Sequence, residues 1–189
     1  MGKFKFIPTP INGVFEIEPT VYGDQRGYFL ESYNRKDFFE AGITAEFVQD
    51  NQSLSIKGTL RGMHLQENYP QAKLVRVLSG EVYDVCVDLR KGSPTFGKWH
   101  GVYLSGENKR QFFIPRGLAH GFLVLSETAE FAYKCDEFYH PEDERGFVWD
   151  DPTVAVQWPL DEIGQPILSE RDTKLPFLLG LRLDGYGAL

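Results

Sequence analysis

Two histidines stand out in this chain because each is set among glycines in a segment that has the composition of a β-strand. His64 follows Gly58 by six residues in GTLRGMHLQ, and IPRGLAH places Pro115, Gly117 and His120 in a proline-x-glycine-x-x-histidine spacing. An imidazole can ligate a metal ion or move a proton near neutral pH. These two residues are therefore the first candidates for a site that does chemistry.

A metal centre is the first kind of site to weigh. On a β-rich background the two motifs resemble the signature motifs of the cupin superfamily, whose metal-binding members add a second histidine and a glutamate to the first motif. Here Gln66 takes the place of the second histidine, and no acidic residue lies between Pro70 and Ala72. His100 and His140 lie in turn-like sequences. Since a working site needs three or more protein ligands, we expect no metal.

The neighbours of His64 favour a catalytic histidine over the more usual one that is satisfied by a backbone carbonyl in the core. Arg61 precedes it by three residues and Lys73 follows it by nine, and a jelly roll brings His120 and the tyrosine of EFAYKC to the same cavity. Burying so many ionisable groups is costly unless they face a polar ligand. Strict alternation puts Arg61 and His64 on opposite faces, so we expect a bulge at Gly62.

Short strands must position these residues. EVYDVCVDL alternates, and LVRVL, GVYL, QFFI, HGFLVL and EFAYKC are short apolar runs between turn-forming stretches. The first of these runs places two sets of side chains on opposite faces: Tyr83, Val85, Val87 and Leu89 on one, and Asp84, Cys86 and Asp88 on the other. Even spacing of strands and turns predicts an antiparallel, all-β sandwich or barrel.

Helix signals are few. NRKDFFEAG has Asn34 placed to cap a helix of about two turns and Gly42 placed to end it. A second candidate helix runs from Ser169 toward Pro176. The predicted fold class is all-β, a double-stranded β-helix (jelly roll) of the cupin type with a few short helices.

Composition narrows the function further. A chain of 189 residues is suited to a single domain over 1–189, and its net charge of −7 argues against nucleic acid as a partner. An anionic ligand would need a local cluster of Lys and Arg. No apolar run approaches the ~20 residues of a membrane-spanning helix, and MGKFKFIPTP lacks the features of a signal peptide. Cys86 and Cys135 are expected to be reduced, so we expect a cytoplasmic protein with no membrane partner.

Several sequence blocks, in order from about Phe6 to about Pro176, resemble those of the dTDP-4-dehydrorhamnose 3,5-epimerase family. They are DQRGYFLESY, FVQDNQS, GTLRGMHLQ, QAKLVRVLSGEVYDVCVDLRKGSPTFGKW, IPRGLAHGFLVLSE, YKCDEFYHPEDERG and LSERD. The resemblance implies inversion of carbons 3 and 5 in the 4-keto sugar of a dTDP-linked substrate. Both carbons flank the ketone, so loss of a proton gives an enolate, and protonation from the other face inverts the centre. This chemistry implies that no metal, redox group or other cofactor is required.

The resemblance also implies the catalytic roles. His64 is the base, Asp172 pairs with its far nitrogen, Tyr133 is the proton donor and Lys73 polarises the ketone oxygen. Tyr139 competes with Tyr133 as the acid. The residues themselves leave structural alternatives open: a helix capping box for the carboxylate, a buried tyrosine for the phenol, and a solvated strand-end lysine for the ammonium.

Substrate contacts follow from the same resemblance. It implies that Arg61 and Arg171 bind the diphosphate and that Glu144 and Tyr139 lie on the nucleobase side. It also implies that His120 forms a hydrogen bond with the sugar or assists at the ketone. The remaining implied contacts to nucleotide and sugar are Arg26, Glu31, Gln49 and Asn51. The stretch with Arg26 crosses a subunit interface in this family, so a homodimer is implied. A single-carbon epimerase and a non-catalytic sugar-binding cupin are the alternative functions.

Overall fold

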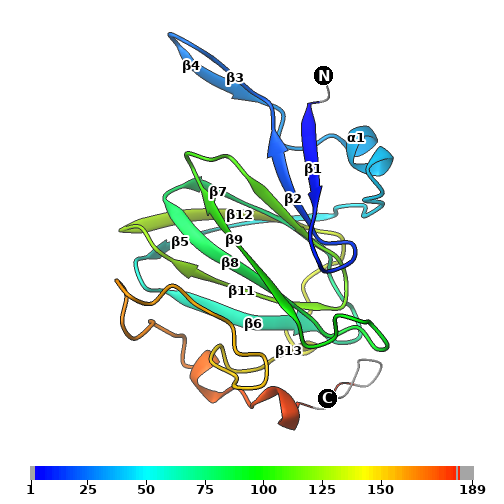
Figure 1. The fold of residues 1–189 in the computed structure, drawn as a ribbon, viewed down its shortest axis with the longest axis vertical. Helices are drawn as coiled ribbons and strands as arrows, with labels where there is room; N and C mark the ends of the chain where they lie inside the picture. Colours follow the sequence, from blue (N-terminus) through cyan, green and yellow to red (C-terminus); the bar gives the residue numbers. More distant parts are fainter. Residues whose placement is uncertain (1–2, 182, 184–189) are drawn as a thin grey trace.

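The computed structural model describes residues 3–181 and 183, and most of its ordered elements are strands (Figure 1). In chain order the strands are β1 (Phe4–Pro8), β2 (Phe15–Pro19), β3 (Val21–Asp24), β4 (Gly27–Leu30), β5 (Gln49–Ile56), β6 (Leu60–Gln66), β7 (Lys73–Ser79), β8 (Glu81–Asp88), β9 (Trp99–Ser105), β10 (Gln111–Ile114), β11 (Leu118–Val124), β12 (Thr128–Cys135) and β13 (Glu144–Gly146). The other elements are the helix α1 (Arg35–Glu40) and two 3-10 turns, η1 (Asp172–Lys174) and η2 (Leu178–Gly180).

Two antiparallel sheets build the body of the molecule. Within the described residues, one sheet has the strand order β1-β2-β10-β7-β12-β5 and the other has the order β13-β6-β11-β8-β9. The hairpin β3–β4 forms a separate pair and projects away from both sheets in Figure 1. Neighbouring strands in each sheet are often far apart in sequence, as in a jelly roll. The predicted all-β class with few short helices is confirmed.

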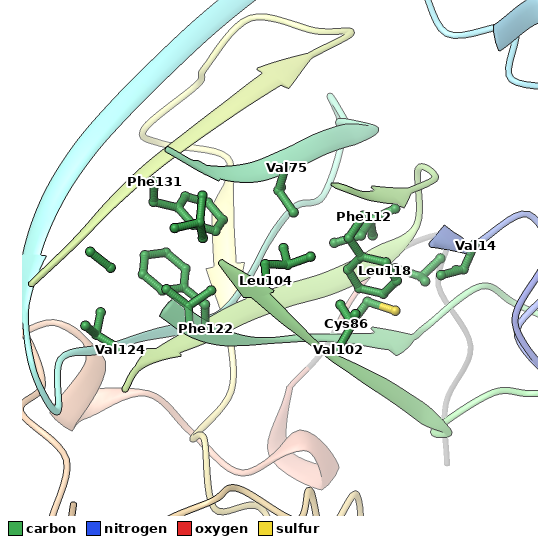
Figure 2. Packing of buried hydrophobic residues seen from close by; sticks show 14 of the residues in the cluster. Val14, Val75, Cys86, Val102, Leu104, Phe112, Leu118, Phe122, Val124 and Phe131 are labelled. Atoms are coloured by element: carbon green, nitrogen blue, oxygen red, sulfur yellow. The ribbon is translucent and has the colours of Figure 1, made fainter. Parts of the chain in front are cut away.

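The main core fills the space between the two sheets. Figure 2 shows large apolar side chains from both layers meeting there, and the rings of Phe122 and Phe131 stack with their centroids 4.2 Å apart. The alternation of β8 explains its contribution, because Cys86 points into this core while Val85 and Val87 point to the opposite face. Each large side chain buried in full stabilises the fold by about 1.5–3 kcal/mol.

A second core lies on the outer face of the sheet that contains β6. The segment after β13 packs its apolar side chains against this face, and Phe147 and Trp158 are buried there. In Figure 1 the orange and red part of the chain follows the sheet beside β6 and β13. This packing places Asp172, which is far from β6 in sequence, next to that strand.

The helix α1 begins as predicted. The side chain of Asn34 accepts hydrogen bonds from the backbone N–H groups of Lys36 and Asp37, and Gly42 follows the helix with a φ of +89°. The second candidate helix is only the 3-10 turn η1, with Pro176 two residues after its end. No helix in residues 3–181 or 183 has both the length and the apolar character needed to cross a bilayer.

Candidate active site

A bulge between β6 and β11 brings Arg61 and His64 to one face, as predicted. His64 pairs with His120 and Arg61 with Phe122, so three steps along β6 oppose two along β11. Gly62 lies in the bulge with a φ of +131°, and a Cβ at this position would come within 2.5 Å of the backbone of the facing strand. Only glycine fits there. Because of the bulge, the side chains of Arg61 and His64 line the same cavity.

The cavity has a volume of about 440 Å³ and opens between the two sheets. This volume lies within the usual range of about 300–1,000 Å³ for small-molecule sites. Ten of the thirteen predicted site residues line it: Asn51, Arg61, His64, Lys73, His120, Tyr133, Tyr139, Glu144, Arg171 and Asp172. The sequence reasoning therefore collected into one site residues from six strands, the loop between β12 and β13, and the C-terminal segment.

His64 and Asp172 form a close pair inside the cavity. The Nε2 atom of His64 lies 2.6 Å from Oδ1 of Asp172, whose side chain is 4% exposed. Burial alone would raise the pKa of Asp172, but its hydrogen bond and charge interaction with His64 leave it below the ordinary value. An ionised carboxylate accepts the Nε2–H bond, so the lone pair of neutral His64 is on Nδ1.

Asp172 also takes part in the capping interaction that its sequence context predicted. Its backbone N–H donates to Oγ of Ser169 at 3.1 Å, while its carboxylate contacts His64. The two interpretations are therefore compatible. The 3-10 turn η1 fixes the backbone of Asp172, and the packing of the C-terminal segment fixes the turn.

Glu144 lies on the other side of His64. Its Oε1 atom is 3.6 Å from Nδ1 of His64, and its carboxylate accepts a hydrogen bond from the hydroxyl of Tyr139 at 2.9 Å. Arg171 forms an ion pair with the same carboxylate. The strand β13 pairs with β6 and so holds Glu144 at this place. The roles of Glu144 at the nucleobase and of Arg171 at a phosphate stay predictions.

Tyr133 has the protonation state that a proton donor needs. Burial, followed by the charges of Cys135 and Glu144, raises its pKa to about 12, so the phenol is protonated at neutral pH. The Nζ atom of Lys73 lies 5.9 Å from the centre of the Tyr133 ring. Arg61, also in the cavity, opposes the shift through its positive charge. The phenol and the two cations thus line the same cavity.

His120 has a carboxylate partner that the sequence reasoning did not identify. Its Nε2 atom lies 2.9 Å from each oxygen of Asp84, which is fully buried. The sequence contained a signal for a buried carboxylate, because the alternation of β8 places Asp84 on the same face as Cys86, which lies in the core. A carboxylate on an apolar face requires a partner, and this partner is the second motif histidine.

Three predicted residues lie outside the cavity lining. Gln49 is next to it, because its side chain donates to Asn51 and accepts from the backbone N–H of Tyr139. Arg26 lies in the exposed turn of the hairpin β3–β4, and Glu31 pairs with Lys3 at 2.9 Å. Their roles in binding the substrate stay predictions.

Gln66, at the place of the missing metal ligand, holds two loops at the cavity. Its amide group donates to the backbone oxygens of Tyr69 and Phe138 and accepts from the backbone N–H of His140. No cluster of three or more His, Cys, Asp or Glu side chains suited to a metal occurs among the described residues. The turn-like context expected for His100 is wrong, since this residue belongs to β9 and contacts Glu16 at 3.0 Å.

Comparison with known proteins gives a consistent result. A family model described as dTDP-4-dehydrorhamnose 3,5-epimerase matches residues 8–179. The chain is 54% identical over 172 residues to a protein of that name from Methanothermobacter thermautotrophicus, covering 91% of this chain and 93% of the relative. It is 57% identical over 163 residues to one from Pseudomonas aeruginosa, covering 86% and 89%.

A solved structure agrees with these relatives. The crystal structure of dTDP-6-deoxy-D-glucose-3,5-epimerase from Legionella pneumophila, in complex with dTDP-4-keto-L-rhamnose, superposes with a TM-score of 0.93. It is 52% identical in sequence and the match covers 98% of each chain. The jelly-roll fold therefore has a close counterpart among solved structures.

Proposed function

We propose a function from one premise: the chain belongs to the dTDP-4-dehydrorhamnose 3,5-epimerase family. It is an isomerase that inverts carbons 3 and 5 of the sugar in dTDP-4-dehydro-6-deoxy-D-glucose and gives dTDP-4-dehydro-L-rhamnose. The observation that carries this proposal is the His64–Asp172 pair, whose atoms are 2.6 Å apart, in the same cavity as the protonated phenol of Tyr133.

The first step is removal of a proton beside the ketone. Nδ1 of His64 takes the hydrogen from carbon 3 or carbon 5, and the electron pair of the C–H bond moves into the ketone to form an enolate. Asp172 stabilises the imidazolium that results, because its buried carboxylate already accepts the Nε2–H bond. Lys73 supplies the positive charge for the enolate oxygen.

The second step is protonation from the opposite face of the ring. Tyr133 donates its phenolic proton to the carbon, and the electron pair of the enolate forms the new C–H bond. Exchange with solvent then removes the proton from His64 and restores the one on Tyr133. Tyr139 is the weaker candidate for the acid, because its hydroxyl already donates to Glu144 at 2.9 Å.

The nucleotide end of the substrate needs positive charge that an acidic chain must provide locally. Arg61 and Arg171 line the cavity, and each is held by a neighbour, Ser55 for the first and Glu144 for the second. We assign the diphosphate to these two guanidinium groups, whose planar geometry suits bidentate contacts with phosphate oxygens.

A homodimer completes the proposal. The hairpin β3–β4 has the exposed aromatic side chains Tyr28 and Phe29, the second of which is 69% exposed, and it carries Arg26 at its turn. A projecting hairpin of this kind supports an exchange between subunits in which Arg26 reaches the site of the other copy. We also propose that 1–189 acts as one domain in the cytoplasm, since Cys86 and Cys135 are both free and buried.

The experiment is incubation with dTDP-4-dehydro-6-deoxy-D-glucose in deuterated water, followed by NMR of the sugar. We expect label at carbons 3 and 5 together with the L-rhamno product. Label at one carbon only would identify a single-carbon epimerase. Binding of the nucleotide sugar without label would identify a non-catalytic sugar-binding cupin.

A further inference from the structure

A second histidine–carboxylate pair lies in the same cavity as the first. His120 is the register partner of His64, so both side chains point to the same face of the sheet. The side chain of His120 is 9% exposed and lines the cavity, whereas Asp84 is fully buried and does not. The Nε2 edge of the His120 ring therefore faces the core, where it contacts the carboxylate of Asp84.

Among the described buried carboxylates, Asp84 has fewer hydrogen-bond donors than Asp88, Asp143 and Asp151. Both of its oxygens contact the same atom, Nε2 of His120, at 2.9 Å. By contrast Asp88, on the same strand and equally buried, accepts bonds from Arg90, Ser93 and Thr95. Burial raises the pKa of Asp84, and His120 and Lys73 act against that shift. Asp84 thus depends on these two neighbours.

The charges around Asp84 bear on whether the His120 ring is neutral or an imidazolium. The side chain of Lys73 brings one positive charge and that of Asp84 one negative charge. The remaining groups that face His120 are Cys86 and His64, its register partners, and the rings of two phenylalanines. Burial raises the pKa of Cys86, so this thiol is neutral. A neutral His120 leaves the buried group without net charge, whereas an imidazolium would leave an uncompensated positive charge.

We propose that Asp84 is a positioning residue, which holds His120 with its proton on Nε2 so that Nδ1 is a fixed acceptor for a hydroxyl group of the sugar. No described residue forms a hydrogen bond with Nδ1 of His120. The inference rests on the proposed function, because it needs a sugar in the cavity. It assigns the roles within the cavity: His64 takes a proton, Lys73 faces the ketone oxygen, and His120 accepts from a hydroxyl.

The test begins without substrate. Nitrogen-15 NMR of the full chain distinguishes protonated from unprotonated ring nitrogens, and the four histidines of the sequence give few signals to assign. We expect His120 to carry one proton, on Nε2. In Asp84→Asn the amide can itself donate to Nε2, so we expect the proton to move to Nδ1 in a large share of molecules. Asp88→Asn is the matched control and leaves the His120 signals unchanged.

The kinetic part uses His120→Gln, because a glutamine can still donate to Asp84 while it removes the acceptor at the Nδ1 position. We expect an unchanged thermal midpoint and a kcat/KM lowered about 10-fold, the loss of one hydrogen bond to the sugar. If Asp84→Asn does not fold, the protonation of His120 in the wild-type spectrum and the kcat/KM of His120→Gln still test the proposal.

Two results would overturn the inference: a wild-type His120 with protons on both nitrogens, or a folded His120→Gln variant with the kcat/KM of the wild type. Failure of the proposed function is recognised separately, since wild-type protein would then take no deuterium into the sugar whatever the NMR state of His120.

Discussion

Replacing Asp172 by asparagine removes the charge behind His64 and leaves the shape of the side chain unchanged. The pair is short, 2.6 Å between Oδ1 and Nε2, and Asp172 is 4% exposed, so solvent cannot take the place of the lost charge. An asparagine amide can donate to Nε2, which places the proton on Nδ1 and removes the lone pair that acts as the base.

The magnitude follows from two contributions. Loss of a hydrogen bond to a charged group costs about 1.5–3 kcal/mol, or roughly 10- to 100-fold in rate. The wrong tautomer adds to this, and the corresponding change in the Ser-His-Asp triad lowers kcat by about 10⁴-fold. We therefore expect Asp172→Asn to lower kcat by about 10²- to 10⁴-fold.

The assay is the initial rate of product formation followed by NMR, with circular dichroism to confirm the fold. Glu170→Gln is the matched control, because Glu170 is an exposed carboxylate two residues away that contacts Lys174 and not His64. We expect the control to retain the wild-type rate. A folded Asp172→Asn variant within about threefold of the wild-type kcat would refute the role of this carboxylate, since even the smaller contribution exceeds that change.

Three further predictions concern other parts of the molecule. Tyr133→Phe should slow product formation by about 10²-fold or more while label still exchanges at the carbon, because the donor is lost and the base remains; full activity would place the acid elsewhere. The pKa of Asp88 is held at about 2 against the effect of burial by one guanidinium and two hydroxyl groups, below its ordinary value of 3.8. The ionised carboxylate of Asp88 therefore stabilises the fold by about 2 kcal/mol above pH 4, and this contribution is lost as the pH falls toward 2. We expect the midpoint pH of acid unfolding, followed by circular dichroism, to differ between Asp88→Asn and the wild type, and equal midpoints would contradict this. Phe29→Asp in the projecting hairpin should give monomers in light scattering and a lower kcat/KM, because Arg26 no longer reaches a second site; a dimer of unchanged mass would contradict the exchange.

The sequence predicted most of the site because its signals are local or come from family resemblance. The alternation of β8 predicted that Asp84 shares a face with Cys86, and the parity conflict between Arg61 and His64 predicted the bulge at Gly62. The structure shows that the face with Cys86 is the interior one. The pairing of Asp84 with His120 was not predicted, because it depends on β8 and β11 being neighbours in the sheet.

The remaining differences have the same origin in tertiary packing. The segment that begins at Ser169 has a helical cap signal, but its docking on the outer face of the β6 sheet leaves only one 3-10 turn. The position of Glu144 beside His64 depends on the pairing of β13 with β6, which a three-residue strand does not reveal in sequence.

The most direct test of the catalytic role of His64 compares wild-type protein with His64→Ala, both treated with a chelator, in deuterated water with the dTDP-linked 4-keto sugar. The account predicts deuterium at both carbons that flank the ketone with the wild type and none with the variant, although circular dichroism shows the variant to be folded. Continued labelling by His64→Ala, or loss of wild-type labelling on chelation, would contradict it.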